Sequence, residues 1–351
     1  ILTAARNAAL DSIADGPEKD AGIAFGNTVA QAYIAARSGD GSDINFMRPV
    51  NHDVGHWEPD PETPGQSAWG PKWGLVSPFV ANPNSYTYPH GIPNLNSPEY
   101  TAAFEEARTK GVLTGSTRTA DEEHIALFWA YDRATMGPPP VMFNTNLHEI
   151  ALTAGNTEEE NARLFAMASV AMADAAIVAW DYKFAEDFWR PVTAIRRAAE
   201  DGNDDTIADP NWVPWGAPGD EPIGTDDNFT PPFPTWPSGH ATMGGALFES
   251  LRIFYGTDAM NYALTSQELP IDNNTRQYSS FSQAEWENAV SRIYLGIHWS
   301  FDATDGIAMG NQVADWVAAN RFGAVVVPEP SSWALLLLML VTTGLRLRRK
   351  R

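Results

Sequence analysis

The chain has 351 residues, of which 44% are hydrophobic and 19% charged, a composition that excludes an intrinsically disordered protein and a polytopic membrane protein. Its 44 acidic and 23 basic side chains give a net charge of −21, which excludes long basic surfaces for nucleic acid. The absence of cysteine excludes disulfides, thiolate zinc sites, iron–sulfur clusters and cysteine nucleophiles. The length suffices for one large domain or two ordinary ones.

The first 38 residues differ in composition from the segment that follows them. Residues 1–38 are rich in alanine and predict helix, broken at Gly16-Pro17 and ended by a cluster of turn-forming residues. Residues 39–99 are dominated by Pro, Gly, Asn and Trp and have no sustained period, which predicts a long irregular segment that wraps the domain. Three tryptophans are expected to anchor this segment: Trp57, Trp69 and Trp73.

Helical signals dominate from Ser97 onward. Ser97-Pro98-Glu99 predicts a capped helix start that leads into residues 100–110. Further helices are expected over 119–131, 157–188, 240–255, 282–297 and 302–320. No segment shows the strong alternation of a β-strand, so the predicted fold class is all-α.

The longest of these helices, 157–188, begins with a run of acidic residues and is apolar on most faces at its centre. Arg163 and Asp174 interrupt the apolar stretch. Such interruptions favour a central helix of a bundle over a membrane span.

The C-terminal end has a composition of its own. An apolar run from Trp333 to Leu345 follows Pro328-Glu329-Pro330 and precedes five basic residues. As a helix the run would be about 20 Å long, short of a hydrocarbon core of about 30 Å. This arrangement resembles the PEP-CTERM sorting tail of Gram-negative bacteria. The resemblance implies transient anchoring in the inner membrane, processing by an exosortase and export to the periplasm or outer surface. We therefore divide the chain into one domain, 1–323, and a sorting tail, 324–351.

Three short segments carry residues suited to binding an oxyanion. The first contains Lys183 and Arg190, whose separation of seven residues would place both cations on one helix face. Taken alone, this pair is also typical of a solvated helix surface. In the second segment a proline-rich stretch runs into a helix, where free N–H groups and the helix dipole favour an anion. Three residues lie at this helix start: Ser238, Gly239 and His240.

The third segment ends with His298 and Asp302, four residues apart. The carboxylate can hold one imidazole nitrogen and leave the other free and oriented. Arg292 precedes His298 by six residues, which is about 120° away on an ideal helix. Either its long side chain reaches around the helix, or the helix is perturbed near Gly296. A tetrahedral oxyanion would suit the cations, hydroxyl, helix N-terminus and histidines of all three segments.

The combined pattern, Lys-x6-Arg-Pro, Pro-Ser-Gly-His and Ser-Arg-x5-His-x3-Asp, resembles the signature of the vanadium haloperoxidase and type 2 phosphatidic acid phosphatase superfamily. The resemblance implies an all-α helical bundle with the oxyanion pocket inside one four-helix unit. It also implies that five residues hold vanadate or phosphate: Lys183, Arg190, Ser238, Gly239 and Arg292. His298 would be the axial ligand of vanadium or the nucleophile of a phosphatase. His240 would be the acid–base group, and Asp302 would orient His298.

Two aromatic residues bear on the choice between these chemistries. Trp180 and Phe233 stand where chloroperoxidases of the superfamily have Trp and Phe, and would form an apolar halide niche; ordinary core packing is the alternative. The resemblance thus implies a vanadate-dependent haloperoxidase that oxidises halide with hydrogen peroxide to hypohalous acid. An exported acid phosphatase acting on phosphomonoesters without cofactor, with His298 as nucleophile, and a non-catalytic surface protein remain as alternatives. The other histidines singled out are expected to be packed or solvated: His52, His56, His90 and His124.

Overall fold

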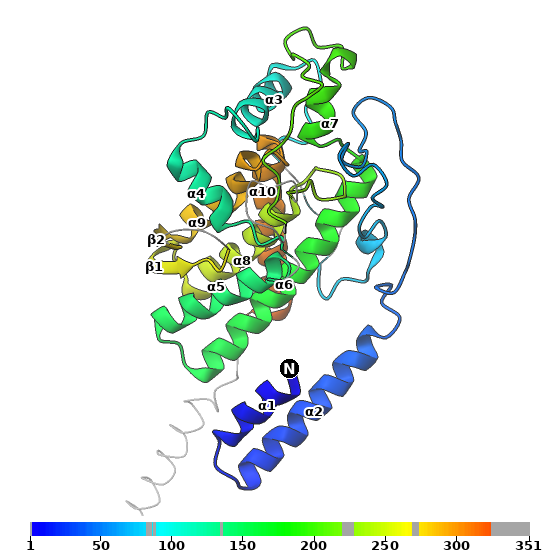
Figure 1. The fold of residues 1–351 in the computed structure, drawn as a ribbon. Coiled ribbons are helices and arrows are strands. Elements are labelled where there is room, and N and C mark those ends of the chain that lie inside the picture. Colours follow the sequence, from blue (N-terminus) through cyan, green and yellow to red (C-terminus); the bar gives the residue numbers. More distant parts are fainter. Residues whose placement is uncertain are drawn as a thin grey trace, which may run out of the picture.

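The computed structural model describes residues 2–81, 86, 89–133, 136–219, 228–268 and 274–323. The tail expected over 324–351 lies outside the described residues, so export and exosortase processing stay predictions. The described chain is mostly helical, as predicted (Figure 1). Its α-helices are α1 (Leu2–Asp11), α2 (Pro17–Arg37), α3 (Pro98–Lys110), α4 (Ala120–Phe128), α5 (Pro139–Ala154), α6 (Glu158–Glu186), α7 (Pro191–Arg196), α8 (Gly239–Tyr255), α9 (Phe281–Tyr294) and α10 (Ser300–Arg321). The described chain also contains two 3-10 turns, η1 (Trp73–Leu75) and η3 (Ala198–Glu200), and two strands, β1 (Ala259–Thr265) and β2 (Thr275–Ser280).

Helices α6, α8, α9 and α10 form the centre of the fold, and α8 packs against the other three. α6 begins at a capping box in which Thr157 Oγ1 accepts from the Glu160 N–H and the Glu160 carboxylate accepts from the Thr157 N–H. Its length and composition would also suit a membrane span, but its apolar side chains pack against α8 and α10. The prediction of a central bundle helix is therefore confirmed.

Glycine allows α8 and α10 to approach closely. A Cβ atom on Gly310 of α10 would collide with the backbone carbonyl of Thr242 on α8. The close crossing brings the N-terminal ends of the two helices together, and the Ser238 N–H donates to the Asp302 carbonyl oxygen at 3.1 Å. Two of the three predicted oxyanion segments meet at this point.

The segment between α2 and α3 is irregular apart from η1 among its described residues, as predicted, and it runs along α6 (Figure 1). Asp174, fully buried in α6, fixes it by accepting three backbone N–H groups from residues 79–81, each at 2.7 Å. Of the three expected anchors, Trp57 is buried, whereas Trp69 and Trp73 are 54% and 39% exposed. These two tryptophans hold the segment through their main chain, since the Trp69 N–H donates to the Pro232 carbonyl and Trp73 lies in η1 against α6. Their indoles are not buried as anchors and line a cavity described below.

Four further features differ from the predictions. Helix α5 was missed because three consecutive prolines occupy its N-cap and first turn, where proline is in fact tolerated. The antiparallel pair β1–β2 was also missed. Its alternation is too short to stand out in the sequence, because on β1 only Tyr262 and Leu264 are buried. The helix expected over 119–131 ends at Phe128, and the helix expected over 282–297 ends at Tyr294.

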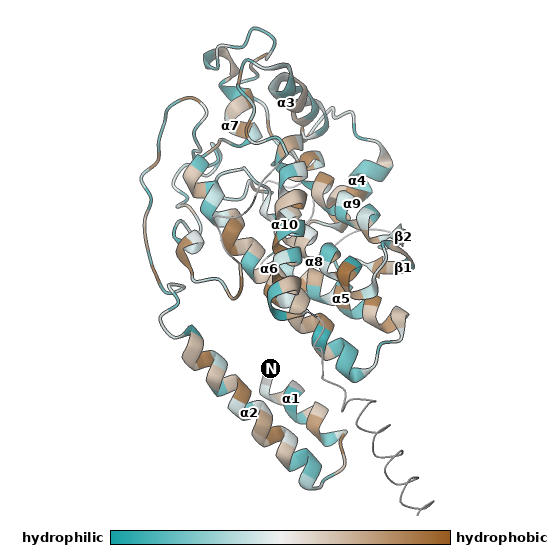
Figure 2. Cartoon of the chain, turned by 180° about the vertical axis from the view of Figure 1, so that it is seen from behind, coloured by the Kyte–Doolittle hydropathy of each residue, from teal (hydrophilic) through white to brown (hydrophobic). Residues whose placement is uncertain are grey.

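Helices α1 and α2 form a hairpin separated at Gly16-Pro17, as predicted (Figures 1 and 2). No residue of α2 is buried, and apolar side chains such as Phe25 and Ile34 are exposed along it. At its C-terminal end the Arg37 guanidinium lies 4.1 Å from the ring centroid of Phe79, which connects the hairpin to the irregular segment.

Candidate active site

The three predicted segments converge at the N-terminal ends of α8 and α10. Their charged and polar side chains are all buried, with no residue more than 6% exposed: Lys183, Arg190, Ser238, His240, Arg292, His298 and Asp302. Each central helix contributes to the cluster, since Lys183 lies on α6, His240 on α8, Arg292 on α9 and Asp302 on α10.

The prediction that Lys183 and Arg190 share one helix face is wrong. α6 ends at Glu186, where Asp187 adopts a left-handed conformation with φ 57°, and Arg190 is the extended residue that precedes α7. The chain turns back at Asp187 and thereby brings Arg190 to the same place as Lys183.

A cavity of about 560 Å³ opens beside this cluster. Gly239, His240, Arg292 and His298 line it directly. Lys183 lies behind the cavity wall, buried with Arg190 and Ser238.

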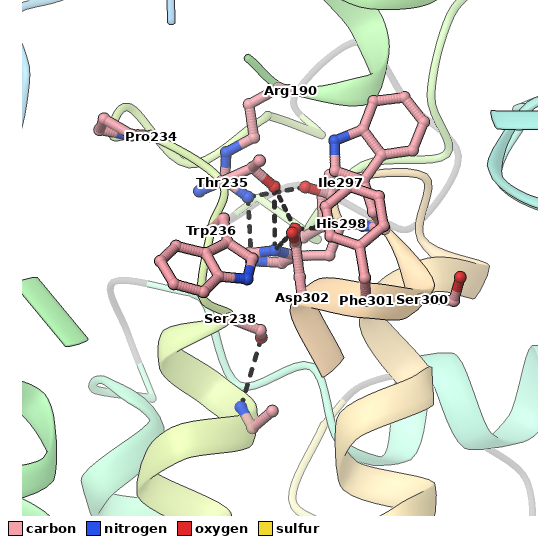
Figure 3. A network of polar contacts seen from close by, with 12 residues as sticks. Arg190, Pro234, Thr235, Trp236, Ser238, Ile297, His298, Ser300, Phe301 and Asp302 are labelled. Carbon is pink, nitrogen blue, oxygen red and sulfur yellow. Dashed lines mark hydrogen bonds and ion pairs between the residues drawn. The ribbon is translucent and has the colours of Figure 1, made fainter. Parts of the chain in front are cut away.

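His298 is held by a hydrogen-bond network (Figure 3). Its Nδ1 lies 2.7 Å from Asp302 Oδ2, the contact expected from the sequence, and 3.1 Å from Thr235 Oγ1. The same carboxylate oxygen accepts from the Thr235 hydroxyl and, at 3.1 Å, from the Trp299 N–H. Nδ1–H therefore donates to Asp302, and His298 Nε2 faces Arg190 Nη1 at 3.0 Å.

The surroundings keep His298 neutral. Burial, followed by the positive charges of Arg190 and Lys183, holds the pKa of His298 well below its usual value. Burial raises the pKa of Asp302, and the hydrogen bond from Thr235 acts in the opposite direction. A neutral His298 with its proton on Nδ1 has a free lone pair on Nε2.

Lys183 and Arg190 hold the proline-rich loop before α8. Lys183 Nζ donates to the carbonyl oxygens of Pro234 and Thr235 at 2.9 and 2.8 Å. Arg190 Nε donates to the Phe233 carbonyl at 2.9 Å, and Nη1 donates to the Ile297 carbonyl at 2.7 Å. Burial lowers the pKa of Lys183 well below its usual value and that of Arg190 to about 9. A bound anion would stabilise both charges.

Arg292 and His240 complete the wall. Arg292 Nη2 pairs with Asp132 Oδ2 at 2.7 Å. Asp132 lies in the loop after α4, so no spacing in the sequence indicated this partner. Burial, then the charge of Arg292, holds the pKa of His240 well below its usual value. The Trp129 backbone acts on this pKa in the opposite direction, and Nε2 has no hydrogen-bond partner among the described residues. His240 is thus a neutral base with Nε2 unpaired.

The unpaired atoms of the cluster fit a tetrahedral oxyanion. Within the described part of the chain, buried Arg190 Nη2 and Arg292 Nε have no hydrogen-bond partner. Ser238 Oγ accepts from the Ala241 N–H at 3.3 Å as the helix cap, and its own hydrogen remains available to an anion. The first N–H groups of α8, beginning at Gly239, face no carbonyl within their own helix. Vanadate and phosphate both match this donor set.

Trp180 and Phe233 lie where the halide niche was expected. Their ring centroids are 4.9 Å apart, and both side chains line the cavity next to Gly239. A Cβ atom on Gly239 would lie 2.8 Å from Trp180 Cζ3, so only glycine lets α8 approach the Trp180 ring this closely.

The loop that carries His298 is fixed by main-chain contacts, which we call the Gly111–Gly296 junction. Gly296 has φ +73° and abuts Gly111 at the end of α3, with no room for a Cβ atom on either residue. The Trp215 N–H donates to the Gly111 carbonyl at 2.7 Å, and the Gly216 N–H donates to the Leu295 carbonyl at 2.8 Å. Of the two sequence-based alternatives for Arg292 and His298, the helix perturbation near Gly296 is therefore correct.

The other histidines lie outside the cavity wall. His52 contacts Glu58 at 3.1 Å, His56 contacts Asp187 at 2.9 Å, and His90 is exposed. His124 lies 2.8 Å from Arg276. The described residues contain no cluster of three or more His, Asp or Glu side chains suited to a metal cation. None of these four side chains lines the cavity, and their packed or solvated role stays a prediction.

Comparison with known proteins identifies the helical bundle. Residues 163–323 match the family model described as "VCPO second helical-bundle domain". The chain is also 35% identical, over 277 residues, to vanadium chloroperoxidase of Curvularia inaequalis. Both matches relate this part of the chain to vanadium chloroperoxidase by similarity. The alignment covers 65% of this chain and 44% of the Curvularia protein, so the chain spans less than half of that relative.

Solved structures of haloperoxidases share the fold of this chain. The first bacterial vanadium-dependent iodoperoxidase superimposes with a TM-score of 0.67 at 25% identity, covering 84% of this chain and 68% of that one. The apo-type bacterial vanadium-dependent chloroperoxidase gives a TM-score of 0.61 at 16% identity, covering 84% and 72%. The predicted helical-bundle fold is confirmed.

Proposed function

We propose that the protein is a vanadate-dependent haloperoxidase that oxidises a halide with hydrogen peroxide to hypohalous acid. One observation carries the proposal. Buried cations with unpaired nitrogens, two neutral histidines and a helix N-terminus converge on one cavity. The homology to vanadium chloroperoxidase favours peroxide chemistry at such a site.

The donor set assigns the residues that would hold vanadate. Five residues would donate hydrogen bonds to its oxygens: Lys183, Arg190, Ser238, Gly239 and Arg292. His298 Nε2 would be the ligand, and Asp302 would hold the imidazole by its Nδ1–H. When bound, vanadate supplies a Lewis acid that activates hydrogen peroxide toward halide.

Arg190 must change its contacts when His298 serves as a ligand. Its Nη1 donates toward the Nε2 lone pair that ligation uses, so this hydrogen bond has to break. Hydrogen bonds to the Phe233 and Ile297 carbonyls keep the guanidinium at the site. Arg190 therefore covers the lone pair of His298 until an anion arrives.

His240 is suited to move the proton of hydrogen peroxide. Its neutral Nε2 has no partner among the described residues and can accept the proton that peroxide loses. The protonated imidazole can then return the proton as hypohalous acid and water form. The balance is one halide, one peroxide and one proton in, one hypohalous acid and one water out.

Phosphomonoester hydrolysis is the second candidate, and one observation favours it. A histidine held by a carboxylate, with its other nitrogen facing an oxyanion pocket, is also the arrangement of a phosphoryl-accepting nucleophile. The mainly aromatic and proline-lined cavity favours halide oxidation instead.

A paired assay on the purified protein separates the candidates. Bromination of monochlorodimedone is followed with peroxide, bromide and orthovanadate, and hydrolysis of p-nitrophenyl phosphate is followed without vanadate. Bromination that requires vanadate and is suppressed by phosphate supports the proposal. Hydrolysis without bromination replaces it with a phosphatase, and inactivity in both assays favours a non-catalytic surface protein.

A further inference from the structure

The cavity is larger than peroxide and halide require. Its volume is about 560 Å³, whereas one water-sized reactant occupies about 30 Å³. A second cavity of about 530 Å³ adjoins it. The two share four wall residues: Trp73, Pro140, Ala176 and Met243. Pockets of about 300–1,000 Å³ are typical of organic ligands.

The outer wall presents two fixed tryptophans. The Trp69 N–H donates to the Pro232 carbonyl at 2.9 Å, and the Trp69 carbonyl accepts from Trp180 Nε1 at 3.3 Å. Trp73 lies in η1, which packs so closely on α6 that Gly74 leaves no room for a Cβ atom against Asp181. Both indoles are nevertheless substantially exposed, so a planar apolar molecule could cover them without a change of backbone.

The chemistry of the wall selects the kind of molecule. Beyond the oxyanion cluster the lining is mostly Trp, Phe, Pro and Met, which favours an uncharged aromatic group. The charged side chains on the wall are already paired, Asp132 with Arg292 and Arg133 with Glu268. The net charge of −21 disfavours an anionic molecule.

We propose, as an extension of the proposed function, that this cavity binds an electron-rich aromatic substrate and halogenates it before hypohalous acid leaves. A ring carbon forms a bond to the halogen as the oxygen–halogen bond of hypohalous acid breaks. The ring proton leaves with the released hydroxide as water. Hydrogen peroxide and halide supply the oxidant. The aromatic wall at Trp69 and Trp73 positions the acceptor, and Trp180 connects it to the oxyanion cluster.

A competition experiment tests this inference. Equal amounts of 2-naphthol, an apolar acceptor, and 4-hydroxybenzoate, a charged one, are brominated by the vanadate-loaded protein or by reagent hypobromous acid, and the product ratio is measured by chromatography. We expect the protein to favour 2-naphthol by about three- to tenfold over the reagent ratio, in line with the strength of aromatic contacts. Trp73→Ala should return the ratio toward that of the reagent. Trp286→Ala, which alters an exposed tryptophan on α9 outside the cavity, should not.

Two further measurements separate failure of the site from failure of the proposed function. Triiodide formation from iodide and peroxide reports halide oxidation without an organic acceptor. Calorimetric titration of 2-naphthol into vanadate-free protein reports the site without any reaction. A ratio equal to that of the reagent, with triiodide formation intact, overturns the inference. So does an absence of 2-naphthol binding. Binding of 2-naphthol that weakens in Trp73→Ala but not in Trp286→Ala supports the aromatic site. If such binding is measured but no triiodide forms, only the haloperoxidase function is rejected.

Discussion

Gly239 is a position at which a single added methyl group should disturb the oxyanion site. In Gly239→Ala the new Cβ atom would lie 2.8 Å from Trp180 Cζ3 and 3.6 Å from Lys183 Cε. Carbon atoms prefer a separation of about 3.5–4.0 Å, so the Trp180 ring or the start of α8 must move by roughly 1 Å. Such overpacking costs about 1–3 kcal/mol, and the preference of helices for Ala over Gly offsets about 0.5–1 kcal/mol. The free energy of unfolding should fall by about 1 kcal/mol.

The effect on anion binding should be larger than the effect on stability. A displacement of about 1 Å at a preorganised site can cost about 100-fold in activity, and we expect vanadate affinity to weaken by at least about tenfold. Urea unfolding and titration with orthovanadate measure the two quantities. The double variant Gly239→Ala/Trp180→Phe should recover part of the stability, because the clashing ring atoms are removed.

A matched control is available on α2. A Cβ atom on Gly22 would contact nothing within 4 Å, so Gly22→Ala should not lower stability or vanadate affinity. Unchanged vanadate affinity in Gly239→Ala would refute the role assigned to this close approach. A loss of stability that Trp180→Phe fails to relieve would show that the clash is not its cause.

Four further predictions follow from buried contacts. His298→Ala should abolish vanadate binding and vanadate-dependent activity while circular dichroism stays native; retained activity would place the site elsewhere. Thr235→Val, which removes the hydroxyl bonded to the carboxylate that holds His298, should weaken vanadate binding about 10–100-fold, whereas Thr235→Ser should not. Asp174→Ala removes the acceptor of three buried N–H groups and should lower the free energy of unfolding by at least about 3 kcal/mol. The variant should be cleaved rapidly by protease near residues 79–81, and resistance equal to that of the unaltered protein would contradict this prediction. Because the pKa of His240 lies well below its usual 6.5 when folded, the unfolded chain binds one more proton there between these values, and His240 should contribute a fall in stability of about 1.4 kcal/mol per pH unit below pH 6.5, to which His298 adds a similar fall. His240→Gln should remove that part of the slope in urea titrations at pH 5 and 7, and an unaltered slope would mean that His240 titrates normally.

The residue types and order of the motifs predicted the membership of the oxyanion cluster but not its local geometry. Lys183 and Arg190 meet because the chain reverses at Asp187, and nothing in the sequence indicates a left-handed residue there. Arg292 and His298 meet because α9 stops at Tyr294 before Gly296. Helical spacing was the wrong argument for Lys183 and Arg190. For Arg292 and His298 the interruption near Gly296 was one of the two alternatives that the sequence left open.

The partners of the cluster were harder to predict than its members. Asp132 reaches Arg292 from a loop 160 residues earlier in the chain, a tertiary contact with no local signal. Thr235 stands three residues before Ser238 in the proline-rich stretch, and only the folded loop shows that its hydroxyl meets Asp302. Most helices, by contrast, were predicted from short-range patterns, because the capping residues and apolar runs that indicate a helix lie within that helix itself.

The Gly111–Gly296 junction positions His298 independently of the side chains that shape the cavity. Backbone atoms of three chain segments set the position of His298, whereas side chains from other segments, such as Trp69, Trp73 and Phe233, shape the space above it. Replacing these wall side chains leaves the scaffold beneath the imidazole untouched. Under the proposed function, the choice of halide or organic acceptor can therefore be retuned, in the laboratory or by natural variation, while His298 stays in place.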